Sequence, residues 1–126
     1  LININKKIIK TKGTTDSEYM HKYFVNMLNK NNYQYNIKVL NNMIISFFKN
    51  LKETDTANVI YGDNKYIWVS RYYKGKDTEP LSLYYDNSNG IVISSEPVTQ
   101  NYKVFPKNTV IIYNHNGEVV NKINLN

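Results

Sequence analysis

The residues best suited to chemistry lie in the stretch KGTTDSEYMHKYFVNML (12 to 28), at the start of an amphipathic segment. Hydroxyl and carboxylate side chains gather there around Asp16. A carboxylate at a helix start either interacts favourably with the positive end of the helix dipole or binds a cationic group of a ligand. The residue types alone favour the capping role and leave the binding role open.

Other residues with chemical potential do not form a recognisable site. Neither His21 nor His115 has Cys, Asp or Glu at a spacing typical of a metal site, and Glu18 with His21 supplies only two possible ligands. Ser17 and His21 lack an orienting acid and oxyanion donors nearby. The five glycines form no phosphate-binding loop. We therefore predict no metal, no cofactor and no catalytic residue within this chain.

Composition limits the remaining function classes. The chain has 126 residues, 41% of them hydrophobic, which fits one globular domain or less. It has no cysteine, so it supplies neither a disulfide nor a thiol nucleophile. The net charge of +6 comes from scattered lysines with one Arg, Arg71, and a nucleic-acid surface would need a concentrated basic stripe. No apolar run or leader-like segment indicates a membrane or an export route, so the expected location is cytoplasmic.

Two helices are predicted in the first half. Thr15 and Glu18 have the spacing of a capping box, and the apolar residues that follow fall on one helical face, which predicts a helix over 16 to 29. Asn31 and Asn32 interrupt this pattern. A second run with apolar residues spaced by three and four predicts a helix over 35 to 52.

The second half is predicted to form strands, because after Thr56 the apolar period changes from 3.6 to 2. Asn89-Gly90 and Asn116-Gly117 suit turns with positive φ. The pattern predicts an α+β chain of two helices followed by a mostly antiparallel sheet of about six strands, without an internal domain boundary. The candidate strands are 58 to 62, 65 to 73, 81 to 86, 90 to 96, 102 to 105, 109 to 114 and 118 to 125.

Twelve tyrosines raise the question of a stacking surface for bases or sugars. Tyr72 with Tyr73, and Tyr84 with Tyr85, are adjacent pairs within candidate strands. Adjacent strand residues point to opposite faces of a sheet, so the rings of each pair are separated. Packing in the core and on the sheet surface is therefore the favoured interpretation.

Four segments, taken in order, resemble the C-terminal half of the class-II glutamine amidotransferase domain. They are GTTDSEYMHKYFVNML (13 to 28), NVIYGDNKYIWVSRY (58 to 72), the pair LSLYYD to GIVISSEPV (81 to 98), and VFPKNTVIIYNHNGEVV (104 to 120). The likeness is greatest to the small stand-alone amidotransferase-like subgroup. It implies an N-terminal-nucleophile hydrolase fold, an αββα sandwich of which this chain would form half, as a single partial domain over residues 1–126.

The resemblance also implies a role for one residue. In that family the Asp of the Thr-Asp-Ser-Glu segment binds the α-amino group of the substrate, which assigns Asp16 as the substrate-binding residue. A rigidly held carboxylate is a suitable acceptor for an ammonium group. The implied substrate is glutamine or a γ-glutamyl compound, and the implied reaction is amide hydrolysis.

The family's nucleophile cannot be placed in this sequence. It is an amino-terminal Cys, and the chain contains no Cys and begins with Leu1. We therefore expect the chain alone to be inactive. It is expected to be a fragment of a longer protein, since LININKKIIK opens without Met, or else a half-domain that needs a separate chain. Because half a sandwich leaves an apolar sheet face uncovered, we expect association with the missing N-terminal half or with another copy.

Three functions follow as hypotheses. The first is part of a glutaminase or amidotransferase-type amidohydrolase domain. The second is a non-enzymatic binding or regulatory module that keeps the fold without the nucleophile. The third is nucleic-acid binding through the basic surface, which the scattered lysines make the least favoured.

Overall fold

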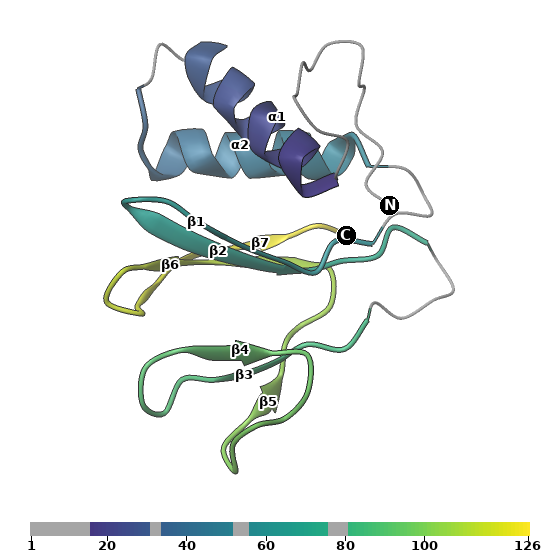
Figure 1. Cartoon of the computed structure of the whole chain (residues 1–126), viewed down its shortest axis with the longest axis vertical. Helices are drawn as coiled ribbons and strands as arrows, with labels where there is room; N and C mark the ends of the chain where they lie inside the picture. Colours follow the sequence, from purple (N-terminus) through teal and green to yellow (C-terminus); the bar gives the residue numbers. More distant parts are fainter. Residues whose placement is uncertain (1–15, 31–33, 52–55, 76–80) are drawn as a thin grey trace. The chain divides into compact units, whose positions relative to one another are not determined.

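The computed structural model of the chain describes residues 16–30, 34–51, 56–75 and 81–126 (Figure 1). Within these ranges two helices are followed by seven strands, which confirms the predicted α+β class. The described residues divide into two compact units with the boundary between Asp55 and Thr56, where the apolar period changes. The prediction of one partial domain over residues 1–126 stays a prediction.

The first unit contains α1 (Asp16–Lys30) and α2 (Ile37–Lys49). The start of α1 agrees with the predicted helix, whereas α2 begins later and ends earlier than predicted. Asn36 explains the later start, because its side-chain Oδ1 accepts a hydrogen bond from the backbone N–H of Val39 at 3.0 Å and caps the helix. Asn50 forms the other cap, with its N–H donating to the Phe47 carbonyl at 3.1 Å.

Aromatic side chains join the two helices. The ring of Phe47, which is almost completely buried, lies 5.6 Å from the ring of Tyr23 and 5.5 Å from that of Phe24. The Tyr23 hydroxyl also forms a 2.8 Å hydrogen bond with the Ser46 hydroxyl. The apolar stripes read from the sequence therefore meet in this interface. Neither helix of the described residues is long and apolar enough to cross a membrane.

The second unit contains two antiparallel sheets. One has the order β1-β2-β6-β7 and the other β4-β3-β5, so the strands that the sequence placed in one sheet divide between two. A period of two identifies strands but does not specify which strands pair, which is why the pattern could not show this division. The strands are β1 (Val59–Gly62), β2 (Tyr66–Arg71), β3 (Tyr84–Asp86), β4 (Val92–Ser94), β5 (Lys103–Val104), β6 (Thr109–Asn114) and β7 (Val119–Asn124).

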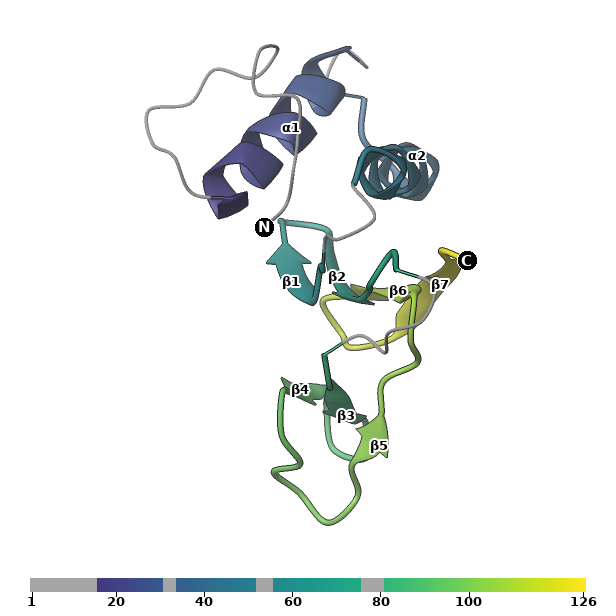
Figure 2. The same cartoon turned by 90° about the vertical axis from the view of Figure 1, so that its right-hand side faces the viewer.

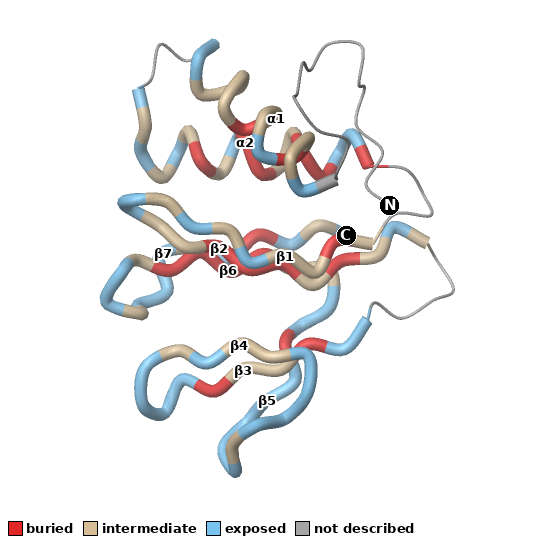
Figure 3. The backbone as a smooth tube through the Cα atoms, viewed as in Figure 1, coloured by how far each residue is buried: buried red, intermediate tan, exposed pale blue. Residues whose placement is uncertain are grey.

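The two sheets lie face to face, and a shared core holds them together (Figure 2). Val69 of β2 is opposite Ile111 of β6, so both side chains point to the same face of the first sheet. The buried residues cluster along both central strands (Figure 3). This inter-sheet core consists of Val69, Leu83, Phe105, Ile111 and Tyr113, with Tyr85, Ile91 and Ile93 packed against it.

Polar side chains close one end of the space between the sheets. Arg71, the last residue of β2, donates from Nε to the Leu81 carbonyl at 3.0 Å and from Nη1 to the Phe105 carbonyl at 2.9 Å. Asn58 donates from Nδ2 to the same Leu81 carbonyl at 2.9 Å. The Leu81 carbonyl thus accepts side-chain hydrogen bonds just before β3, which starts at Tyr84 and not at the predicted residue 81, and the Phe105 carbonyl accepts one just after β5.

Candidate functional site

Asp16, the predicted substrate-binding residue, is the first residue of α1. The orientation of its side chain and the capping residue Thr15 lie outside the described part of the structure. The substrate-amine role of Asp16 therefore stays a prediction. Further along α1, Ser17 and His21 are exposed, and no group of three or more possible metal ligands occurs among the described residues.

A pocket of about 460 Å³ lies between the two sheets of the second unit, at the end opposite Arg71. Residues of the first sheet and of the segment that leads into β4 both line it. The pocket lies beside the inter-sheet core, because Val69 and Tyr113 belong to both the core and the pocket wall. The lining residues are Ile60, Ile67, Val69, Gly90, Ile91, Ile93, Tyr113, Asn114, His115, Asn116 and Gly117.

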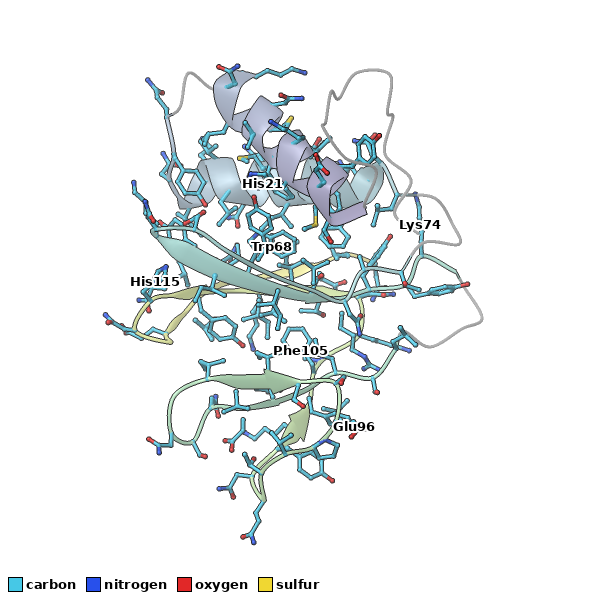
Figure 4. The ribbon with its side chains drawn as sticks, in the orientation of Figure 1. His21, Trp68, Lys74, Glu96, Phe105 and His115 are labelled. Carbon is cyan, nitrogen blue, oxygen red and sulfur yellow. The ribbon has the colours of Figure 1, made fainter. Side chains whose placement is uncertain are left out.

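Two turns line the rim of this pocket, the β6–β7 turn and the turn at Gly90 before β4. In the β6–β7 turn, Asn114 Oδ1 accepts hydrogen bonds from the N–H groups of Asn116 and Glu118, both at 3.0 Å. His115 of the same turn reaches the β1–β2 turn, where its Nε2 lies 2.6 Å from the Asp63 carbonyl oxygen (Figure 4). Gly117 approaches the segment before β4, since a Cβ at this position would lie 3.3 Å from the Ile91 side chain.

The conformations of the turn glycines confirm the sequence prediction. Gly90 and Gly117 have φ of 81° and 80°, a region that residues with a Cβ adopt at a cost. Both glycines line the pocket, so the Asn-Gly turns that the pattern identified as chain reversals also shape its rim. A side chain at Gly117 would narrow the opening as well as strain the backbone.

Tyr113 is the most deeply placed polar residue of the pocket wall. Only 3% of it is exposed, and its hydroxyl makes no hydrogen bond to the described residues. Burial raises the pKa of the Tyr113 phenol, and the neighbouring Tyr85 raises it further. The phenol therefore keeps its proton at neutral pH and remains a hydrogen-bond donor.

No match was found for this chain among known protein families, characterised proteins or solved structures. Function must therefore be argued from its own residues and geometry. The sequence drew attention to His115 but not to the pocket that it borders. No local signal could have identified Tyr113, because its burial beside the pocket depends on the pairing of β6 with β2 and on the second sheet.

The pair Tyr84 and Tyr85 confirms the expected separation of adjacent tyrosine rings. Tyr85 points into the inter-sheet core, where its ring lies 5.8 Å from that of Phe105. Tyr84 points to the other face and its ring lies 5.4 Å from that of Tyr102. The Tyr84 and Tyr85 rings therefore cannot form one stacking surface.

A second polar cluster surrounds Asp86, which is only 7% exposed. Its Oδ1 accepts hydrogen bonds from the N–H and the hydroxyl of Ser88 at 2.8 and 2.6 Å. Its Oδ2 accepts one from the Thr99 hydroxyl at 2.6 Å. The carboxylate thus ties the end of β3 to the segment between β4 and β5, and its acceptor positions serve the fold.

Asp86→Asn is expected to destabilise the protein in a pH-dependent way. The hydroxyl of Ser88, then that of Thr99, and the Ser88 N–H lower the pKa of Asp86, against the opposing effect of burial, and Lys103 adds a smaller lowering. A pKa lowered on folding stabilises the protein above the unfolded value of about 3.9, and this contribution is lost as the pH falls through the folded value. Urea denaturation should therefore show a difference between wild type and variant that narrows below about pH 4.

The matched control for this test is Glu96→Gln, which makes the same change at an exposed carboxylate after β4 (Figure 4). Its effect on the free energy of unfolding is expected to be small at every pH. A loss in Asp86→Asn that stays constant from neutral to acid pH would contradict the stabilising role of the ionised carboxylate.

Proposed function

We propose that this chain forms part of a glutamine amidotransferase or glutaminase-type amidohydrolase domain. The observation that supports this most is the order of elements: a helix that starts at Asp16, a second helix, and then two antiparallel sheets packed face to face. The order of helices and strands is the one that the resemblance of the four sequence segments implies, although the two sheets already pack on each other within this chain. The proposal includes a cytoplasmic location and no nucleic-acid partner.

The proposed chemistry needs a nucleophile from outside these residues, because the chain contains no Cys. A thiolate attacks the side-chain carbonyl of glutamine or a γ-glutamyl compound, and the resulting acyl-enzyme forms as ammonia or the amine leaves. Water then attacks the thioester, which releases the acid and restores the thiol. In this scheme Asp16 binds the substrate α-ammonium group with a charge-assisted hydrogen bond.

Exposed apolar side chains support the proposed association with a missing half-domain or a second copy. Tyr85 and Ile93 face the inter-sheet core, so Val92 and Val104 lie on the opposite face of the β4-β3-β5 sheet. Val92 and Val104 are 37% and 60% exposed, and nearby Tyr102 is 46% exposed. A sheet face of this kind gains free energy when another layer covers it.

Asp16→Asn is expected to lower kcat/KM for glutamine by about 10–100-fold, the loss of one charge-assisted hydrogen bond of about 1.5–3 kcal/mol. The assay measures ammonia release by a longer protein that adds the sequence encoded upstream of Leu1. Glu18→Gln is the matched control, since it makes the same chemical change two residues later. Unchanged kcat/KM in Asp16→Asn would refute the assigned role.

The alternative is a binding or regulatory module that keeps the fold without the nucleophile. The pocket between the sheets favours it, because a preformed pocket of about 460 Å³ falls within the usual size range of small-molecule sites. The two functions differ in the upstream sequence. A Cys directly after the initiator Met, together with glutamine hydrolysis, supports the enzyme, and a longer protein without that Cys supports the module.

A further inference from the structure

The inter-sheet pocket combines an aliphatic wall with a polar rim of Asn114, His115 and Asn116. Among its lining residues no Asp, Glu, Lys or Arg occurs, and five are β-branched aliphatic residues: Ile60, Ile67, Val69, Ile91 and Ile93. Such walls stabilise apolar surface by removing it from water, and they offer no counter-charge to an ionised group. The walls therefore select for an uncharged, mainly apolar occupant.

The Tyr113 hydroxyl on the pocket wall can orient a ligand. The Tyr113 residue as a whole is 3% exposed, and its hydroxyl has no hydrogen-bond partner among the described residues. The Tyr113 hydroxyl does not belong to the fully buried side-chain polar atoms that lack a hydrogen bond within the described residues. The hydroxyl therefore keeps accessible surface and is open to an acceptor in the pocket. Since Tyr113 lines the pocket, a ligand in the pocket is a suitable source of that acceptor.

Contacts at the rim hold the pocket open, and the rim residues His115 and Asn116 are exposed. The contact between His115 and the Asp63 carbonyl joins two turns of the first sheet, and Gly117 lies against Ile91 across the opening. Both turns are fixed by their own hydrogen bonds, including those from the N–H groups of Lys65 and Tyr66 to Asp63 Oδ1 at 2.7 and 2.9 Å. A pocket held in this way needs little reorganisation to bind a ligand.

We propose that this pocket binds an uncharged small molecule with an apolar body and a carbonyl oxygen, and that the oxygen accepts a hydrogen bond from the Tyr113 hydroxyl. The apolar body contacts the isoleucine and valine walls. Free glutamine is excluded, because its ammonium and carboxylate groups would lose their hydration without gaining an opposite charge. The pocket is thus separate from the role proposed for Asp16, and it does not depend on the proposed enzymatic function.

The test uses the whole chain and the uncharged naphthyl ketone prodan, whose fluorescence shifts to the blue in an apolar environment. We expect saturable binding of one prodan per chain, without displacement by L-glutamine. Tyr113→Phe removes only the hydroxyl and is expected to weaken binding by about 3–10-fold, the value of one hydrogen bond. Tyr84→Phe makes the same change on the opposite face of the second sheet and is expected to leave the affinity unchanged.

A second variant tests the position of the ligand. Ile60 lines the pocket and is 59% exposed, so Ile60→Trp introduces bulk at the opening with little effect on the core. This variant is expected to lose prodan binding at least tenfold while its urea denaturation stays close to that of the wild type. The proposal is overturned if no saturable binding occurs, if L-glutamine displaces prodan, or if neither Tyr113→Phe nor Ile60→Trp weakens binding.

Discussion

Phe105→Ala is expected to lower the free energy of unfolding by about 3–5 kcal/mol. The Phe105 side chain has no exposed surface and belongs to the inter-sheet core, where its ring lies 5.8 Å from that of Tyr85. Removal of the ring leaves a cavity between the sheets, and the loss is a large part of the 5–15 kcal/mol that stabilises a typical domain. Urea denaturation followed by the fluorescence of Trp68, the single Trp and a residue of β2, measures the effect.

Two further variants make this result interpretable. Phe105→Leu keeps most of the apolar volume and is expected to cost about 1 kcal/mol, so it gives a measurable value even where Phe105→Ala fails to fold. Val104→Ala changes the neighbouring residue, which is 60% exposed, and is expected to stay within about 0.5 kcal/mol of the wild type. A similar small loss in Phe105→Ala would contradict the packing of the two sheets on this core.

The local features of the fold could be predicted because local chemistry determines them. The strand β6 has the predicted bounds, since its continuous apolar run from Val110 to Tyr113 is flanked by Asn108 and by the Asn116-Gly117 turn. The hairpin of β1 and β2 was also predicted from its turn residues and is confirmed by their antiparallel pairing. Both features depend on residues close to each other in the sequence.

The division into two sheets could not be predicted, because it depends on contacts between distant residues. Leu83, Phe105 and Ile111 meet in one core although no local pattern connects them. The bounds of α2 were predicted less well for a different reason: the side chain of Asn36 caps a first-turn N–H that has no acceptor within the helix, and helical periodicity does not detect that bond.

The two candidate sites also differ in whether they depend on local sequence or on contacts between distant residues. Asp16 was singled out in the sequence by the hydroxyl and carboxylate residues beside it, which alone favour capping, and only the family resemblance predicts its substrate role. The pocket could not be found in the sequence, because its walls come from strands that are brought together only by the fold. The two sites also differ in charge: a carboxylate suits an ammonium group, whereas a wall without Asp, Glu, Lys or Arg suits a neutral ligand.

Arg71→Met is expected to lower the free energy of unfolding by about 2–3 kcal/mol, since hydrogen bonds from charged groups contribute about 1.5–3 kcal/mol each and partial exposure reduces their sum. The guanidinium joins β2 to the carbonyls of Leu81 and Phe105, on either side of β3 in the sequence. Its fork geometry reaches both oxygens at once, which a Lys ammonium on a flexible stem does less well, so Arg71→Lys is expected to recover only part of the loss.

The control for Arg71→Met is Lys122→Met, which removes one positive charge from an exposed position of β7. It is expected to change stability by no more than about 0.5 kcal/mol in the same urea measurement. If both variants lose equally little, the two carbonyl bonds do not stabilise the joined sheets. A loss of stability in Arg71→Met alone would instead assign the one Arg of the chain a structural role. Its hydrogen bonds to the Leu81 and Phe105 carbonyls close the end of the inter-sheet space that lies away from the pocket.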